Sequence, residues 1–330
     1  MSWLTPEDVV AAERDVYYDP AYLRSVAGDD EIRVLCTPTL TMPLILRPLP
    51  AWLGEATLRD AETPYGYAAP LASGPVDWES VRHELAQHGV VNAFVRGHPL
   101  QDWCGLPEKQ SSPTVFISLE AGRDQAFAGG RCATHRSQVN RAKAQGFTAD
   151  VCEAPTDLSA FRQLYELTMA RLQAAEFYRF ADASWQHLVG LGRKLALITV
   201  RDAQSKVHAQ ALFLRGRNFA HYHLSARSDD AHNAAGHLQF EAAADWACAN
   251  GCQAIHLGGG TSGREDDGLL AFKRRIGKGD ATFRVAGLIA DEARHHDLIA
   301  RWASRSGETP RWFQAYRQLF SSGLRPDAFG

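Results

Sequence analysis

The stretch that decides the fold is residues 194–224, KLALITVRDAQSKVHAQALFLRGRNFAHYHL. Its first part, Lys194–Arg201, is apolar on both faces. Val207–Leu214 follows a polar turn, and Phe219–Leu224 follows the tight turn Arg215–Asn218. Short connections of this kind join neighbouring strands of an antiparallel sheet. The stretch therefore predicts a three-stranded meander.

The residues around the meander predict alternating helices and strands. Helical spacing of apolar residues, glycine stops and polar turns mark each segment. The expected strands are Gly146–Glu153, Cys252–Leu257 and Ala281–Leu288, and the expected helices are Asp157–Gln173, Ala183–Gly192, Ala234–Asn250 and Gly268–Ile276. With the meander, the order is β-α-α-β-β-β-α-β-α-β.

The first half is less regular. It predicts an amphipathic opening from Pro6 to Ser25, strands at Glu31–Cys36, Met42–Arg47, Val90–Arg96 and Thr114–Leu119, and helices at Asp77–His88 and Ala133–Gln145. A chain of 330 residues is long enough for two domains. We expect an α+β protein with an N-terminal domain over residues 1–145 and a C-terminal domain over residues 146–330.

Composition excludes several classes of protein. The formal net charge of −3 argues against a DNA-coating protein. The start of the chain has no signal-peptide pattern and no apolar run is long enough to span a membrane, so a cytoplasmic location is expected. The six cysteines lack zinc-ligand spacing, since Cys248 and Cys252 have only His256 nearby. No metal is therefore predicted.

The element order and five short motifs resemble the tandem GNAT acyltransferases of the FemABX-like type. The motifs are Tyr65/Tyr67/Pro70, Arg141–Gly146, Ala220–His223, Trp246/Ala247/Gly251 and Phe272–Lys273. The resemblance covers nearly the whole chain. It implies two GNAT-like domains in tandem, the first degenerate, each with a mixed and mostly antiparallel sheet flanked by helices.

In this family the acyl donor lies where two central strands part, with its phosphates on the amides that open the next helix. The resemblance thus assigns donor binding to Asn233, Ala235, Gly236 and Phe272. The usual acetyl-CoA signature is altered here, because Asn233 precedes Ala-Ala-Gly and His237 follows. Asn233 could instead be an ordinary helix cap.

Three residues are candidates for catalysis. The resemblance implies Tyr222, and His223 is an independent candidate for removing a proton from the amine. In Phe219–Leu224, alternation predicts that His221 and His223 face one way and that Tyr222 and Leu224 face the other. Lys273 is expected to bind a phosphate or stabilise an oxyanion. The alternatives are a solvated basic helix edge for Lys273 and structural roles for the others.

Acceptor binding is expected between the two halves. The resemblance assigns it to Tyr65, Tyr67 and Arg171, and Arg136 is a plausible anion clamp. Tyr178, in the aromatic run after Arg171, is a further candidate. Any of these residues could instead serve in packing or in an interdomain ion pair.

We therefore expect an N-acyltransferase that moves an aminoacyl or acyl group onto an amine acceptor, such as a cell-wall (peptidoglycan) or envelope precursor. The co-substrate would be aminoacyl-tRNA or acyl-CoA, with no tightly bound cofactor. The altered signature and the cations of Lys273–Lys278 favour tRNA, whereas the overall acidity favours CoA. The alternative is a noncatalytic tandem-GNAT protein that binds a phosphorylated or sugar ligand.

Overall fold

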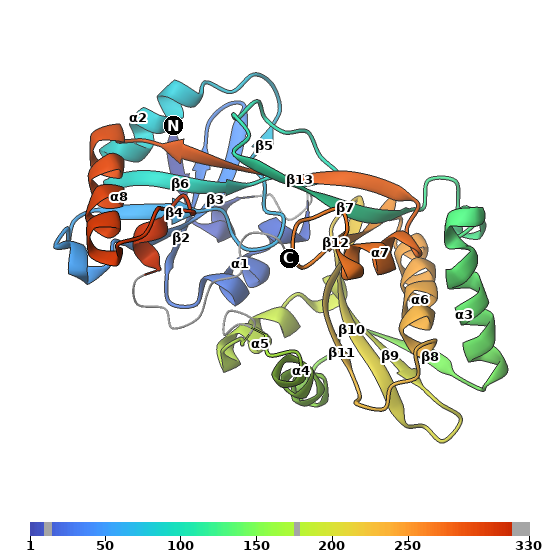
Figure 1. The fold of residues 1–330 in the computed structure, drawn as a ribbon. Coiled ribbons are helices and arrows are strands. Elements are labelled where there is room, and N and C mark those ends of the chain that lie inside the picture. The colour runs from blue at the N-terminus through green and yellow to red at the C-terminus, as the bar shows by residue number, and fades with distance from the viewer. Residues whose placement is uncertain (10–14, 175–178, 319–330) are drawn as a thin grey trace.

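The computed structural model describes residues 1–9, 15–174 and 179–318. A single sheet of 13 strands runs through both halves of the molecule (Figure 1). Its order is β1-β2-β3-β4-β6-β13-β7-β12-β11-β10-β9-β8, and β5 pairs with β3. Only the pairs β4–β6 and β11–β12 are parallel. The expected α+β class with a mostly antiparallel sheet is confirmed.

The strands are β1 (Ser2–Leu4), β2 (Glu31–Cys36), β3 (Leu40–Pro48), β4 (Arg59–Glu62), β5 (Leu71–Ala72), β6 (Val90–Arg96), β7 (Gln110–Ser118), β8 (Thr148–Glu153), β9 (Leu195–Arg201), β10 (Val207–Arg215), β11 (Phe219–Arg227), β12 (Ala254–Gly259) and β13 (Gly279–Ile289). The helices are α1 (Pro20–Ala27), α2 (Trp78–Gln87), α3 (Ala133–Ala144), α4 (Ser159–Arg171), α5 (Asp182–Val189), α6 (Ala235–Ala249), α7 (Gly268–Arg274) and α8 (Glu292–Ser306). The predicted meander is β9–β10–β11 and is confirmed.

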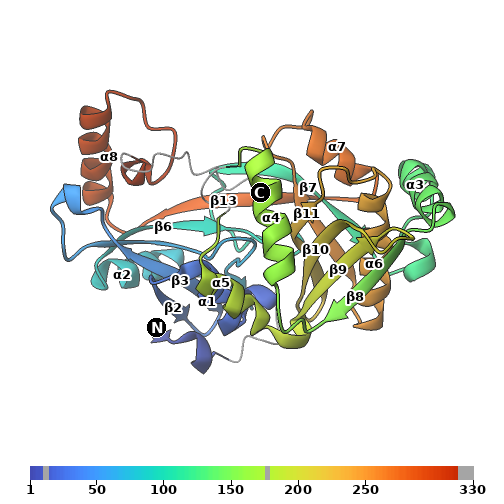
Figure 2. The same cartoon turned by 90° about the horizontal axis from the view of Figure 1, so that it is seen from below.

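The two halves share one motif. In each, a strand leads through a helix to a parallel neighbour: β4, α2 and β6 in the first half, and β11, α6 and β12 in the second. Two long strands then cross between the halves. β7 pairs with β12, and β13 pairs with both β6 and β7 (Figure 2). The boundary between residues 145 and 146 stays a prediction.

Helices cover both faces of the sheet in the second half. One face, called the α6 face, packs a buried cluster with Phe213, Phe240 and Leu270 under α6 and α7. The opposite face, called the α4 face, packs Phe161, Trp185 and Leu212 with side chains of α1, α4 and α5. Among the described helices, none is long and apolar enough to cross a membrane.

Candidate active site

The sheet opens in the middle of the second half, between β11 and β12. These strands pair only from Phe219 with Ala254 to His221 with His256. Beyond these residues, β11 has a bulge at His223 in its pairing with β10, and β12 has a bulge at Leu257 in its pairing with β7. A bulge leaves its extra residue outside the ladder and bends the strand. The two strands therefore separate and leave backbone groups unpaired between them.

The bulge at His223 changes the predicted alternation of β11. Leu212 is opposite Leu224, but the next residue, Phe213, is opposite Tyr222. Tyr222 thus lies on the α6 face and Leu224 on the α4 face, so the prediction that they share a face is wrong. His221 and His223 both contact α4-face tyrosines. The two catalytic candidates Tyr222 and His223 therefore face opposite sides of the sheet.

The environments of Tyr222 and His223 differ. The Tyr222 ring lies 5.3 Å from Phe213 and 5.1 Å from Phe240, and burial raises its pKa. Burial and the nearby charge of His221 lower the pKa of His223 to about 3. At neutral pH both side chains are uncharged, so His223 is a weak base in this unliganded arrangement. Their catalytic roles stay predictions.

Lys273 points inward from α7. It is buried, with 6% of its surface exposed, and its Nζ donates to the Gly259 carbonyl oxygen at 2.6 Å, at the end of β12. Burial lowers the pKa of Lys273 to about 8, against the opposing effect of Asp267. The alternative of a solvated basic helix edge does not describe this residue. Its neighbour Arg274 does pair at the surface, with Glu265 and Asp280.

Asp267 fixes the loop that presents Lys273. Its Oδ1 accepts from the backbone of Leu269 and Leu270 and caps α7, while its Oδ2 accepts from both the backbone and the hydroxyl of Thr261. A Cβ at Gly260 would lie 2.4 Å from this carboxylate, so only glycine fits there. Gly260 is therefore part of a packed support for α7.

The first turn of α6 lies beside the opening in the sheet. Ala235 and Gly236 are buried in that turn, and Asn233 is exposed just before it. The alternative that Asn233 caps the helix is wrong, because Ala234 occupies the cap position and has no side-chain bond. Phe272 of α7 contacts His237 of this turn, with ring centroids 5.2 Å apart. Donor binding by these residues stays a prediction.

A cavity of about 400 Å³ lies between the halves on the α4 face. Six cationic side chains line it: Arg47, Arg96, Lys109, Arg179, Arg311 and Arg317. Its acids, Asp30 and Glu62, pair with Arg47 and Arg96. Within residues 1–9, 15–174 and 179–318, no carboxylate pairs with Lys109, Arg179 or Arg311. The cavity is therefore suited to an anion.

Tyrosines connect this cavity to β11. Tyr65 lines the cavity, and its carbonyl oxygen accepts from the Tyr22 hydroxyl at 2.9 Å. The Tyr22 ring lies 5.8 Å from the ring of His223. Tyr67 is buried nearby, 4.5 Å from the ring of His256. Among the predicted acceptor residues that the structure describes, only Tyr65 lines the cavity.

The predicted arginine clamps have other partners. Arg136 donates to the carbonyl oxygens of Phe127 and Gly129, both at 2.7 Å, and so holds the turn before α3. Arg171 pairs with Asp229 at the surface of α4. Tyr178 lies outside the described residues. Substrate binding by these three residues stays a prediction without a contact that favours it.

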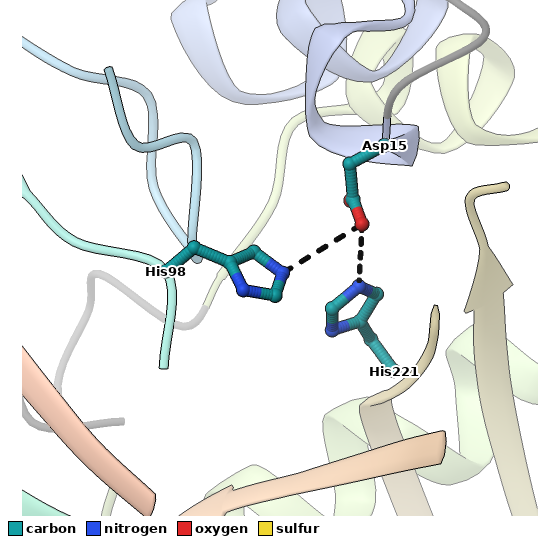
Figure 3. Close-up of side chains that lie close together, drawn as sticks. All are labelled: Asp15, His98 and His221. Atoms are coloured by element: carbon teal, nitrogen blue, oxygen red, sulfur yellow. Dashed lines mark hydrogen bonds and ion pairs between the residues drawn. The ribbon is translucent and has the colours of Figure 1, made fainter. Parts of the chain in front are cut away.

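A buried trio, Asp15, His98 and His221, was missed by the sequence analysis. The side chains come from the N-terminal segment, from the loop after β6 and from β11, and they converge on one carboxylate oxygen (Figure 3). Asp15 Oδ2 lies 3.2 Å from His221 Nε2 and 3.6 Å from His98 Nε2. Because these residues are far apart in sequence, no local motif reveals them.

The hydrogen bonds of the rings favour proton sharing over a metal. A histidine that binds metal through Nε2 must carry its proton on Nδ1 and donate it to a second group. Here His98 Nδ1 instead accepts from the Leu100 backbone at 3.1 Å, and His221 Nδ1 has no partner. His221 Nε2 therefore directs its proton at Asp15, whereas His98 Nε2, at 3.6 Å, makes no hydrogen bond within the described residues. The histidine protons lower the pKa of Asp15 although burial opposes this.

This trio gives a first prediction. Asp15 Oδ1 accepts from the Tyr17 backbone and Oδ2 accepts from His221, so Asp15→Asn leaves one of these two buried donors without an acceptor. We expect a loss of about 2 kcal/mol in the free energy of unfolding, measured with urea. A chelator should leave the wild-type midpoint unchanged. A chelator-dependent fall in the midpoint would instead show that the trio holds a metal.

The comparisons with known proteins agree with this geometry. Residues 130–274 match the family described as acetyltransferase (GNAT) domain. None of the curated proteins matches the chain significantly in sequence. The matched residues run from α3 to α7 and include β11, β12 and Lys273.

Solved structures share the fold across both halves. FemX is 12% identical and has a TM-score of 0.61, with 90% of this chain and 99% of that chain covered. L-PGS from Bacillus licheniformis is 15% identical and has a TM-score of 0.54, with 86% and 91% covered. The C-terminal domain of a candidate lysylphosphatidylglycerol synthetase from Agrobacterium fabrum is 15% identical, with a TM-score of 0.56 and 86% and 95% covered. Residues 130–274 therefore match a GNAT acetyltransferase domain, and the chain as a whole has a FemX-like fold.

Proposed function

We propose that the chain transfers an aminoacyl or acyl group from a carrier ester or thioester onto the amine of an anionic acceptor. The observation that carries the proposal is the cation-lined cavity, which Tyr65 and Tyr22 connect to the bulge of β11. It gives the acceptor a site on the α4 face, while the first turn of α6 gives the donor a site on the other face. Transfer is expected where β11 and β12 part, between these two sites.

The expected reaction is direct attack of a neutral amine on the donor carbonyl. The backbone freed by the bulges and the Lys273 ammonium would stabilise the oxyanion as the carbon–oxygen or carbon–sulfur bond breaks. Positioning of the two substrates would supply much of the remaining acceleration. Two of the structures of similar fold are named for lysylphosphatidylglycerol synthesis or L-PGS, and the first of these names a lysyl group joined to a phosphate-bearing molecule. This supports an aminoacyl donor and a phosphorylated acceptor, such as an envelope or cell-wall precursor.

The acceptor site can be tested by removing two of its cations. The double variant Lys109→Gln/Arg311→Gln should raise KM for a phosphorylated amine acceptor at least tenfold, because each charge-assisted hydrogen bond contributes about 1.5–3 kcal/mol. KM for the donor should stay within twofold. The matched control is Arg82→Gln/Arg217→Gln, which removes the same charge from exposed positions elsewhere. Equal KM values for the acceptor in the two double variants would refute the assignment of the cavity as the acceptor site.

The donor can be identified by transfer assays with acetyl-CoA and with charged tRNA, using the same acceptor. The cytoplasmic location and the envelope acceptor belong to the same proposal. A thermal-shift titration with CoA is the simplest first step, because a ligand at 100 times its Kd stabilises by about 2.7 kcal/mol. A shift with CoA would favour acyl-CoA. Transfer from charged tRNA without that shift would favour the aminoacyl donor.

A further inference from the structure

The last described stretch of the chain, Arg311–Gln318, closes one side of the cavity between the halves. This stretch, called the C-terminal strap, follows α8. It supplies six of the residues that line the cavity: Arg311, Trp312, Phe313, Gln314, Arg317 and Gln318. The strap lies outside residues 130–274, which match the GNAT domain. It therefore adds residues to the cavity that the matched domain does not contain.

Buried hydrogen bonds hold the strap to β4 and β6. The Tyr316 hydroxyl donates to Asp60 Oδ2 at 2.9 Å and accepts from Asn92 Nδ2 at 3.0 Å. Arg317 binds both carboxylate oxygens of Asp60, each at 2.6 Å. Gln314 donates to Asn92 Oδ1 at 2.9 Å. Because Tyr316 and Asp60 are buried, these bonds fix the strap on the sheet and give its cavity-lining residues a defined position.

Phe313 of the strap packs against a glycine of β13. A Cβ at Gly287 would lie 2.3 Å from the Phe313 ring, so any larger residue there would displace the ring. Gly287 pairs with Phe94 of β6, whose ring lies 6.5 Å from that of Phe313. The ring of His295 stacks on Phe313 at a distance of 5.0 Å. These contacts fix the Phe313 ring at the wall of the cavity.

The Phe313 ring in turn contacts Lys109. The Lys109 Nζ lies 5.3 Å from the ring centroid, within the range of a cation–π interaction. Its backbone N–H donates to the Val285 carbonyl oxygen at 2.8 Å, while its side chain is exposed at the cavity. Since the described part of the chain offers Lys109 no carboxylate, the aromatic ring is the contact that orients its ammonium.

We infer that the C-terminal strap selects the acceptor: Arg311 binds a phosphate of the acceptor, and Phe313 is a positioning residue that holds Lys109 in the same cavity as a second cation. This inference rests on the proposed function. Arg311 is exposed, lines the cavity and pairs with no carboxylate among the described residues. A phosphate carries a charge of about −1.5 to −2 at pH 7, so it gains more from two cations than a carboxylate does.

The contact between Lys109 and Phe313 can be measured without an acceptor. Reductive methylation with 13C-formaldehyde labels the six lysines and keeps their charge, and Lys109→Arg assigns the Lys109 signal. A group over an aromatic face is shielded, so this signal should lie upfield of that of Lys143, an exposed lysine of α3. Phe313→Leu should remove the shift. An unshifted Lys109 signal in the wild type would overturn the inference.

Gly287→Ala is a second way to remove the contact. The added methyl group should displace the Phe313 ring and leave both Lys109 and Phe313 unchanged in sequence. The upfield shift of the Lys109 signal should then be lost, as in Phe313→Leu. A shift that persists in both variants would show that Phe313 does not position Lys109.

Inorganic phosphate tests the anion site. At constant ionic strength, phosphate should move the Lys109 signal of the wild type and leave the Lys143 signal in place. The Kd for phosphate should rise about threefold in Phe313→Leu and about tenfold in Arg311→Gln, because a cation–π contact contributes less than a charge-assisted hydrogen bond. The matched control Arg217→Gln removes an exposed charge elsewhere and should not change this Kd. Equal Kd values in the wild type and in Phe313→Leu, or equal responses of Lys109 and Lys143, would refute the inference.

Kinetics separate this inference from the proposed function. Phe313→Leu should raise KM for a phosphorylated amine about threefold and leave kcat and the KM of the donor unchanged. If Lys109→Gln/Arg311→Gln raises the acceptor KM and Phe313→Leu does not, the inference fails and the function stands. If phosphate binds as described but the protein transfers nothing from acetyl-CoA or from charged tRNA, the proposed function fails and the phosphate site stands.

Discussion

Lys273→Met is expected to lower kcat by about 10²–10³-fold, the usual effect of removing one group that stabilises a developing oxyanion. Lys273 is the buried cation at the end of β12, where the sheet opens. The loop before α7 is held by the hydrogen bonds of Asp267, not by Lys273. Lys273→Met therefore removes the charge and leaves that loop in place. Single-turnover rates with saturating donor and acceptor measure the effect.

The pH profile tests whether the ammonium is the active form. With a pKa of about 8, Lys273 is charged below that pH and loses its proton above it. The wild-type rate should therefore fall as pH rises through about 8. Lys273→Arg keeps its charge in this range, so the alkaline fall should move to higher pH if the guanidinium is accommodated. An unchanged alkaline limb in that active variant would contradict the assignment.

Stability provides the control for folding. The folded-state pKa of Lys273 is below its unfolded value, so the wild type gains stability as pH rises from about 8 towards 10.5. Lys273→Met buries no cation and should be at least as stable as the wild type at pH 7. It should also lack that alkaline gain. A large loss of stability in this variant would mean that lost activity reports unfolding.

The second half of the fold from β8 to β13 could be predicted because its elements carry local signals, whereas helix α8 was not predicted. Alternation, glycine stops and short polar turns mark β9, β10, β11 and α6. By contrast, β4 was missed because three of its four residues are charged. Asp60 and Glu62 are buried there only because Arg317 and Arg96 pair with them from distant segments. A single sequence does not show such pairing.

The candidate site also contains residues that could be predicted from the sequence and residues that could not. Lys273 could be found because its motif is local, but its burial against Gly259 depends on the loop fixed by Asp267. The bulge at His223 could not be predicted, since nothing in residues 222–224 interrupts the alternation. His135 and His237 lie on different helices, and each alone resembles an ordinary helical residue. Their contact becomes visible only when α3 packs on α6.

Buried histidines should make the protein sensitive to mild acid. Burial lowers the pKa of His223 to about 3 and that of His237 and His295 to about 4, and it holds the pKa of His256 well below its usual range. Below pH 6.5 the unfolded chain takes up protons at these rings, whereas the folded chain does not. Stability is therefore complete above pH 6.5 and falls as pH decreases towards the folded values.

The expected loss in the free energy of unfolding is large. Each histidine that stays neutral contributes at most about 1.4 kcal/mol per pH unit, so these four lose up to about 8 kcal/mol between pH 6.5 and 5. Few ordinary carboxylates protonate in this window, which assigns the slope to histidine. Urea unfolding at pH 7.5, 6.5, 5.5 and 5 measures it. A flat free energy across these values would contradict the prediction.

His256→Phe identifies one contributor. Both ring nitrogens of His256 are buried without partners, and its ring packs against Tyr67. Phenylalanine removes two unsatisfied nitrogens at nearly constant shape, so stability at pH 7.5 should stay within about 1 kcal/mol or rise. Its slope between pH 6.5 and 5 should be about one quarter smaller than that of the wild type. An unchanged slope would show that His256 is already protonated in the folded chain, and that a group in its surroundings compensates its charge.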